Sequence, residues 1–237
     1  MRSNSRALAL VLLAALPVAC SRSTPPAAAP AAPAAPAADT QGKKELELYR
    51  QLQQEKSYEL AAPIGAEIVA KYPQSLAAKE VQETLADTTA KATALATRRR
   101  LERLWSYQSG KESGGTQNTA SIYSGDSTET RVRLVLRRHS AWGQSVYLFG
   151  NGKGFECGKS CTVGVRFDEQ PAKRMKAYLP ETGEPALFIS DDKAFLERLG
   201  STQKIAIEVV EKGRGPRTLV FEVGGFESDK FPRLKKG

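Results

Sequence analysis

Two of the three cysteines in this 237-residue chain, Cys157 and Cys161, lie in the stretch GFECGKSCTVGVRFD with three residues between them. Such a pair could bind a metal, act as a redox switch or form a disulfide. A structural zinc site needs four Cys or His ligands, and the only histidine, His139, lies eighteen residues before Cys157. Redox pairs more often enclose two residues and begin at a helix N-terminus, whereas this pair flanks a turn between two β segments.

The letters GKS inside this stretch, Gly158 to Ser160, also match the end of a phosphate-binding loop. That motif requires a glycine five positions before Gly158, where Lys153 stands, and a helix after it, where the sequence predicts a strand. We therefore expect Cys157 and Cys161 to form a disulfide. Its loop of five residues contributes about 2 kcal/mol to stability in the chain-entropy model and fixes a hairpin locally.

No catalytic arrangement stands out among the remaining reactive residues. His139 ends a strand in RRHSAWG, where a lone histidine is usually a polar surface residue. The pair Asp191-Asp192 is explained by the start of a helix, and Asp168-Glu169 by a turn after a strand. A hydrolase that uses carboxylates alone stays open as an alternative. We assign no catalytic, metal-binding or cofactor-binding residue.

The best candidate binding surface is the basic strand RVRLVLRR with the turn after it. Arginine and tryptophan are favoured at binding hot spots. The candidate residues are Arg131, Arg133, Arg137, Arg138 and Trp142. The alternative interpretation is a solvated sheet face that happens to be basic.

Residues 1–19 have the pattern of a secretory signal, with two arginines before the apolar run ALALVLLAAL. Ten apolar residues are too few to span a bilayer, which needs about 20 in a helix. The segment ends in LPVAC, which resembles the lipobox of bacterial lipoproteins. That resemblance implies that Cys20 is acylated and becomes the mature N-terminus. The alternatives are ordinary secretion and an uncleaved anchor.

A lipid on Cys20 leaves the other two cysteines as an even pair in an oxidising compartment, where disulfides persist. Removing the two arginines of residues 1–19 leaves 33 basic and 26 acidic side chains, a net charge of +7. Outside the cytoplasm, such a charge favours the lipid bilayer, an envelope protein or an anionic envelope polymer over nucleic acid as partners. Solubility alone also explains this charge, and we favour that explanation. We expect a lipid-anchored envelope protein, and Ser21 favours the periplasmic face of the outer membrane.

Residues 20–40 are expected to be the lipidated cysteine and a Pro/Ala-rich tether, because proline at every third or fourth position favours polyproline II. Residues 41–108 show helical spacing. Tyr72-Pro73 ends one helix, and Ser75 is the expected N-cap of the next. The stretch AEIVAKYPQSLAAKEVQETL resembles a tetratricopeptide-type hairpin. A single copy implies either an interaction arm or a spacer.

Residues 109–118 are rich in Gly and Ser and are predicted to be a linker. A β-rich domain follows over 119–230, and 231–237 form a basic tail. The β-rich region has seven segments with strand character, RVRLVLRR, QSVYLFG, CTVGVRFD, KRMKAYL, ALFIS, KIAIEVVE and RTLVFEV, and one helix, DDKAFLERLG. The fold class is therefore α+β: a small N-terminal helical domain followed by an antiparallel β-sandwich or partly open barrel with one short helix.

This β-rich region resembles an uncharacterised family of bacterial exported domains. The resemblance rests on LWSYQ, RVRLVLRR, FECGKSCTVGVRFD, ALFISDDKAFLERL, IAIEV and FEVGGF, in that order between Leu104 and Phe226. It implies a fold and an envelope location, but no activity and no catalytic residues.

We therefore predict an envelope lipoprotein whose β domain is a non-enzymatic binding module. One alternative is a carboxylate-dependent enzyme that processes cell wall or lipid, with Asp168 or Glu169 as its candidate groups. A second alternative is an inhibitor of a foreign hydrolase. No cofactor is expected under the leading prediction.

Overall fold

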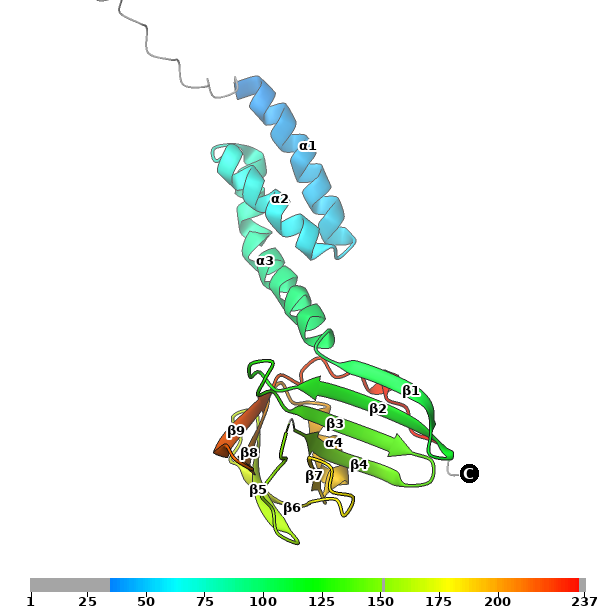
Figure 1. Ribbon diagram of the computed structural model, residues 1–237. Coiled ribbons are helices and arrows are strands. Elements are labelled where there is room, and N and C mark those ends of the chain that lie inside the picture. The colour runs from blue at the N-terminus through cyan, green and yellow to red at the C-terminus, as the bar shows by residue number, and fades with distance from the viewer. Residues whose placement is uncertain (1–34, 151, 235–237) are drawn as a thin grey trace, which may run out of the picture.

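The computed structural model describes residues 35–150 and 152–234. The predicted signal peptide, Cys20 and most of the predicted tether lie outside the described residues. Within them, three α-helices precede a nine-stranded antiparallel sheet that is accompanied by a fourth, short helix (Figure 1). The predicted α+β fold class is confirmed.

The helices are α1 (Ala35–Gln54), α2 (Tyr58–Lys71), α3 (Leu76–Glu102) and α4 (Asp192–Leu199). The strands are β1 (Ser106–Glu112), β2 (Gly115–Tyr123), β3 (Arg133–His139), β4 (Gly143–Phe149), β5 (Cys161–Phe167), β6 (Lys173–Tyr178), β7 (Ala186–Ile189), β8 (Ile205–Glu211) and β9 (Gly215–Phe221). A 3₁₀ turn follows at Ser228–Lys230. No helix in the described part of the chain is long and apolar enough to cross a membrane.

The three N-terminal helices pack around a small core of their own. Tyr49 of α1 is buried there, and its hydroxyl forms hydrogen bonds with the hydroxyls of Thr84 and Thr88 of α3, at 2.9 and 3.0 Å. Gly65 of α2 lies against the same ring, where a Cβ would come within 2.7 Å of it. Ser75 caps α3 as predicted, because its Oγ accepts a hydrogen bond of 3.0 Å from the amide three residues further on.

The helical region differs from its predicted bounds at both ends. α1 begins at Ala35, inside the predicted tether. Pro36 falls in its first turn, where the missing N–H has no helical partner to lose, so proline does not exclude a helix there. At the other end, α3 stops at Glu102 and β1 begins at Ser106, within the region predicted to be helical.

The end of α3 is attached to the β domain, which Figure 1 shows below the helices. Both terminal nitrogens of Arg100 donate hydrogen bonds of 2.8 Å to the carboxylate of Glu222, just after β9. The indole Nε1 of Trp105 donates a bond of 3.3 Å to the carbonyl of Val223. α3 therefore runs without a break from the helical region to the β domain, and the hydrogen bonds of Arg100 and Trp105 attach its C-terminal end there.

The strands form one curled sheet in the order β1-β2-β3-β4-β7-β6-β5-β8-β9. Of the two predicted architectures, the partly open barrel is therefore the one found, and not a sandwich of two sheets. Its concave side carries one apolar core, to which Phe195 and Leu199 of α4 contribute. All seven predicted strand segments form strands.

The predicted linker 109–118 is wrong, because these residues form most of the hairpin β1–β2. Ser113 and Gly114 make its two-residue turn, with φ of 42° and 78°. Positive φ at both central positions is the geometry that fits the twist of a hairpin. Almost every residue of β1 is exposed, so the strand shows no alternation of apolar and polar residues from which it could be predicted.

The predicted basic tail 231–237 also needs correction, since Phe231 is only 1% exposed and belongs to the core of the β domain. The amide of Asn118 donates a hydrogen bond of 3.0 Å to the carbonyl of Pro232, which ties this segment to β2. Residues 235–237 lie outside the described part of the chain. The β domain therefore extends from β1 to at least Pro232.

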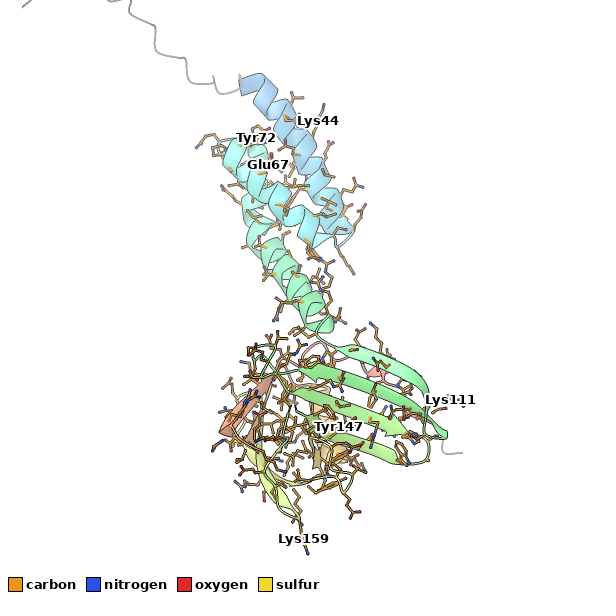
Figure 2. The ribbon with its side chains drawn as sticks, viewed as in Figure 1. Lys44, Glu67, Tyr72, Lys111, Tyr147 and Lys159 are labelled. Atoms are coloured by element: carbon orange, nitrogen blue, oxygen red, sulfur yellow. A yellow bond between two sulfur atoms is a disulfide. The ribbon has the colours of Figure 1, made fainter. Side chains whose placement is uncertain are left out.

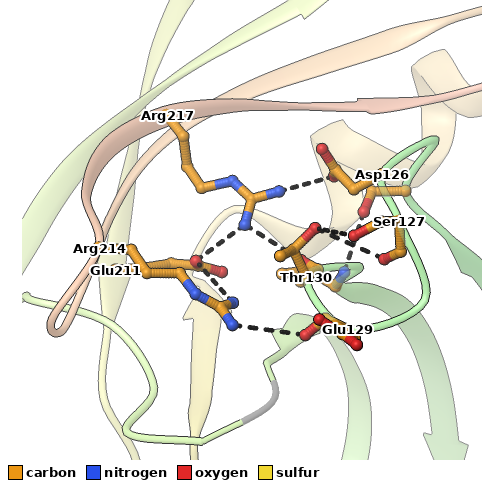
Figure 3. Close-up of polar contacts among 9 residues, drawn as sticks. Asp126, Ser127, Glu129, Thr130, Glu211, Arg214 and Arg217 are labelled. Atoms are coloured by element: carbon orange, nitrogen blue, oxygen red, sulfur yellow. Dashed lines mark hydrogen bonds and ion pairs between the residues drawn. The ribbon is translucent and has the colours of Figure 1, made fainter.

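An ionic network holds the loop after β2 against the β8–β9 hairpin (Figure 3). The guanidinium of Arg217 forms ion pairs of 2.8 Å with Asp126 and 2.9 Å with Glu211, and donates to the carbonyl of Thr130 at 3.0 Å. Arg214 lies 3.5 Å from the same carboxylate oxygen of Glu211. Because Glu211 is only 5% exposed on its side chain, its charge depends on these partners.

Candidate functional site

The alternation of β3 divides the predicted binding residues between two faces of the sheet. Leu134 and Leu136 belong to the core, so Arg133 and Arg137 point to the outer, convex face. Arg138 has the opposite direction: its guanidinium donates to the carbonyl of Phe231 and lies 4.2 Å from that ring. Burial lowers the pKa of Arg138. The prediction that Arg138 shares a face with the other arginines is therefore wrong.

Arg131 lies just before β3 and not within it. Its guanidinium carbon is 4.0 Å from the ring centre of Tyr123, on the neighbouring strand β2. Arg133 is placed in a similar way, 5.4 Å from the ring centre of Phe149, the residue opposite it on β4. The outer face thus carries arginines that are held against aromatic rings of the adjacent strands.

Arg137 lies at the centre of the largest such cluster. Its guanidinium carbon is 5.3 Å from the ring centre of Trp142, 5.4 Å from Tyr147 and 5.9 Å from Phe188. Its Nε donates a hydrogen bond of 3.1 Å to the hydroxyl of Ser145. Cation–π contacts of this kind are worth about 0.5–1 kcal/mol each at exposed positions.

The aromatic residues continue from Arg137 across the sheet. Phe188 of β7 stacks on Tyr147 of β4, with ring centres 4.7 Å apart, and on Tyr178 of β6 at 5.3 Å. In both pairs the two residues lie opposite each other in the register of neighbouring strands. We name the residues Arg137, Trp142, Tyr147, Phe188 and Tyr178 the arginine–aromatic row.

The row is partly open to solvent. Trp142 is 52% exposed and Tyr178 is 41% exposed, whereas Tyr147, which is labelled in Figure 2, is only partly exposed. Burial raises the pKa of Tyr147, and the charge of Glu184 adds to this effect, while Arg137 and Arg133 oppose it. The hydroxyl of Tyr147 is therefore protonated at neutral pH and can donate a hydrogen bond.

His139 is not the surface residue that its position predicted, because it is only 2% exposed. Its Nδ1 accepts hydrogen bonds from the amides of Ala141 and Trp142, at 3.1 and 3.2 Å. Its Nε2 therefore carries the proton and donates to the carbonyl of Glu112 at 2.8 Å. The imidazole stacks on the indole of Trp142 with ring centres 3.8 Å apart. His139 thus positions Trp142 at the edge of the row.

The two cysteines and Asp168, which were also considered for chemistry, have structural partners. Cys157 and Cys161 form the predicted disulfide, with sulfurs 2.09 Å apart. One carboxylate oxygen of Asp168 accepts hydrogen bonds of 2.9 and 2.8 Å from the amides of Gln203 and Lys204. No group of three or more His, Cys, Asp or Glu within the described ranges is placed to hold a metal ion.

A separate cleft of about 500 Å³ opens where β5 and β8 diverge. These strands pair only from Gly164 to Phe167 on β5, and the rest of β8 pairs with the segment before the disulfide. Val163 and Val209 line the cleft, together with Arg174 and Glu208. Since its charges have both signs, the lining favours no single class of ligand.

Sequence reasoning found Arg133, Arg137 and Trp142 but missed the three aromatic residues that complete the row. The signal was present in the alternation of three predicted strands. In QSVYLFG, ALFIS and KRMKAYL, an aromatic residue stands at a position that points away from the core. What the sequence did not show is that these strands lie next to each other.

No family model matches the chain, and no curated protein matches it. Among solved structures, it is similar to the crystal structure of invasion associated protein B from Bartonella henselae, with a TM-score of 0.37 and 19% identity. The similarity covers 53% of this chain and 87% of that one. A similarity of this degree carries no conclusion about fold or activity.

Proposed function

We propose that this chain is a cell-envelope lipoprotein whose β domain is a non-enzymatic binding module. The observation that carries the proposal is the arginine–aromatic row. It gathers Arg, Trp and Tyr, the residue types that dominate binding hot spots, on an outer sheet face. The same face would be expected to carry small polar residues if it were only solvated.

The envelope location is supported by the sequence and by the disulfide. The signal-like segment and the lipobox-like LPVAC favour export and acylation of Cys20. The Cys157–Cys161 disulfide is typical of an oxidising compartment. Under this proposal, the lipid holds the chain at the periplasmic face of the outer membrane, and the helices space the β domain from the bilayer. The resemblance to bacterial exported domains agrees with this placement.

The anchor is tested in the bacterium that makes the protein, by metabolic labelling with a palmitate analogue and by cell fractionation. The wild-type chain is expected to carry the label and to stay with outer-membrane vesicles. Cys20→Ala should lose the label and move to the soluble periplasmic fraction. A labelled Cys20→Ala variant, or an unlabelled wild type, contradicts lipidation at this residue.

The binding module is tested by photo-crosslinking in the same cells. A photoreactive amino acid at position 178 stands on the row, and one at the equally exposed Leu48 of α1 is the matched control. We expect a defined adduct from position 178 that disappears when Arg137→Gln is added, and no such adduct from position 48. The same adducts from both positions, or insensitivity to Arg137→Gln, contradict a binding role for this face.

A further inference from the structure

The four strands that the row crosses carry side-chain charges of one sign, although Glu184 before β7 acts on Tyr147 and Glu208 of β8 lines a cleft with Arg174. The adjacent strands β3, β4, β7 and β6 contain six Arg or Lys residues and no Asp or Glu. Four of these six point outward, because their neighbours along each strand belong to the core: Arg133, Arg137, Arg174 and Lys176. A surface that only needed solubility would mix both signs of charge.

The orientation of the rings adds to the positive potential. Phe188 lies between Tyr147 and Tyr178 in the strand order, and it stacks on both at an interplanar angle of 23°. The ring faces are thus turned toward one another, and the ring edges and tyrosine hydroxyls are left to face a partner. The edge of an aromatic ring is the positive end of its quadrupole.

The arginines are held in place before any partner arrives. Aromatic rings lie close to the guanidiniums of Arg133 and Arg137, and the Nε of Arg137 donates to Ser145, which leaves the terminal N–H groups of Arg137 to form hydrogen bonds with a partner. The Nε of Arg133 is buried and has no hydrogen-bond partner among the described residues. Side chains that are ordered in advance lose less entropy on binding.

From these observations we infer that the arginine–aromatic row, with Arg133, binds a carboxylate-rich protein surface. This inference rests on the proposed binding function and specifies its partner. The donors of the face, which are guanidinium N–H groups, ring edges and tyrosine hydroxyls, all complement Asp and Glu side chains. A carbohydrate would be recognised by stacking on open ring faces, but both faces of Phe188 are covered and His139 covers one face of Trp142.

The size of the patch predicts a weak contact. The row crosses three strand-to-strand steps, or about 14 Å, and β3 is about 24 Å long. The flat area is then roughly 340 Å², less than half of the about 800 Å² per partner of a standard interface. A partner that also reaches Arg131 and Tyr123 on β2 buries more. Because a contact of this size depends mainly on exposed charges, its affinity should fall steeply as the salt concentration rises.

The inference is tested with purified chain lacking residues 1–20 and three anionic probes: a short poly-glutamate peptide, polygalacturonate, and phosphatidylglycerol vesicles. Binding is measured by titration at low ionic strength. We expect the peptide to bind, and Arg133→Gln/Arg137→Gln to weaken it at least tenfold. Arg98→Gln/Arg99→Gln on α3 is the matched control, since it removes the same charge from another exposed surface and should leave affinity within twofold.

A third variant separates the geometry of the row from its charge. Trp142→Ala keeps every charge but removes a ring that braces Arg137, and we expect it to weaken peptide binding several-fold. Circular dichroism of each variant shows whether the fold is retained. Equal losses in both arginine double variants, or no loss in Trp142→Ala, would mean that unspecific charge attracts the peptide and would overturn the inference.

The other probes distinguish a wrong partner from a wrong site. Binding of polygalacturonate or of vesicles that depends on Arg133 and Arg137, without binding of the peptide, overturns the protein partner but leaves the proposed binding face standing. Absence of face-dependent binding for all three probes overturns the acidic partner. The proposed function itself then depends on the crosslinking at position 178, which assumes no charge on the partner.

Discussion

Gly225, in the segment after β9, packs directly against the backbone of Leu101 at the end of α3. A Cβ at position 225 would lie 2.2 Å from the carbonyl carbon of Leu101 and 2.2 Å from the amide nitrogen of Glu102. Both neighbours are backbone atoms and cannot turn aside as a flexible side chain would. The contact between the helical region and the β domain therefore requires glycine at this position.

Gly225→Ala should lower the free energy of unfolding by about 1–3 kcal/mol, the usual range for overpacking. The loss arises because α3 must move away from the β domain to make room. Urea unfolding followed by circular dichroism measures it. Gly200→Ala is the control, since a Cβ at that position meets nothing within 4 Å. Equal stability of Gly225→Ala and wild type would show that the two regions do not touch in solution as described.

The Arg100–Glu222 pair predicts a pH-dependent attachment of α3. Hydrogen bonds from Arg100 hold the pKa of Glu222 below its usual range. A depressed pKa stabilises the fold above the unfolded value of about 4.3, and the stabilisation is lost as pH falls through the folded value. Because both side chains are about half exposed, the pair is worth at most about 1 kcal/mol.

Accordingly, Glu222→Gln should be slightly less stable than wild type at pH 7, and the difference should shrink as pH falls below the unfolded value of about 4.3. Thermal unfolding at several pH values gives this comparison. Glu227→Gln removes another partly exposed carboxylate that pairs with a lysine only three residues away, and it serves as the control. A difference between Glu222→Gln and wild type that grows toward acid would contradict the assignment.

The ionic network around Arg217 should matter more, because the side chains of Glu211 and Arg217 are only 5% and 18% exposed. Glu211→Gln removes the charged partner that lies at 2.9 Å and leaves Arg217 with Asp126 and the carbonyl of Thr130. We expect a loss of about 2 kcal/mol, below the 3–5 kcal/mol for a buried charge left without any partner. Hydrogen exchange should also rise in the loop 124–131. If the loop 124–131 kept its protection from hydrogen exchange in Glu211→Gln, the ionic network would not be what holds that loop against the β8–β9 hairpin.

The disulfide is predicted to stabilise the β domain only locally. Reduction, or Cys157→Ser/Cys161→Ser, should cost about 2 kcal/mol for so short a loop. Exchange protection should fall mainly at the start of β5 and in the cleft beside it. The purified chain without residues 1–20 should show no free thiol before reduction. Two titratable thiols in that protein would contradict the disulfide.

Alternation in the sequence was sufficient to predict the strands that have one buried face. β5 and β8 carry Val, Phe and Ile at every second position, so their existence and their core-facing sides follow from the chain itself. β1 was missed because it lies at the edge of the sheet with nearly all its side chains in solvent. No apolar pattern is needed to hold such a strand, since pairing with β2 along its whole length provides its hydrogen bonds.

In the candidate binding face, too, some features follow from alternation in the sequence and others only from tertiary contacts. Alternation alone requires that the consecutive Arg137 and Arg138 point to opposite faces. Grouping them by charge was therefore an error that the sequence could have prevented. The buried position of His139 has a different cause: its ring is enclosed by contacts from β1 and from the turn at Trp142, which no local pattern reveals.

The sequence by itself determined the α+β class, the core-facing side of most strands, the cap of α3 and the disulfide, because each depends on residues close together in the chain. Only the tertiary structure decided which strands are neighbours. β7 lies between β4 and β6, although β5 and β6 separate it from β4 in the chain. That order brings Tyr147, Phe188 and Tyr178 into one stack beside Arg137. This strand order is set by the way in which the strands bury one common core. The row is therefore a property of the whole folded sheet, and no single segment of the chain specifies it.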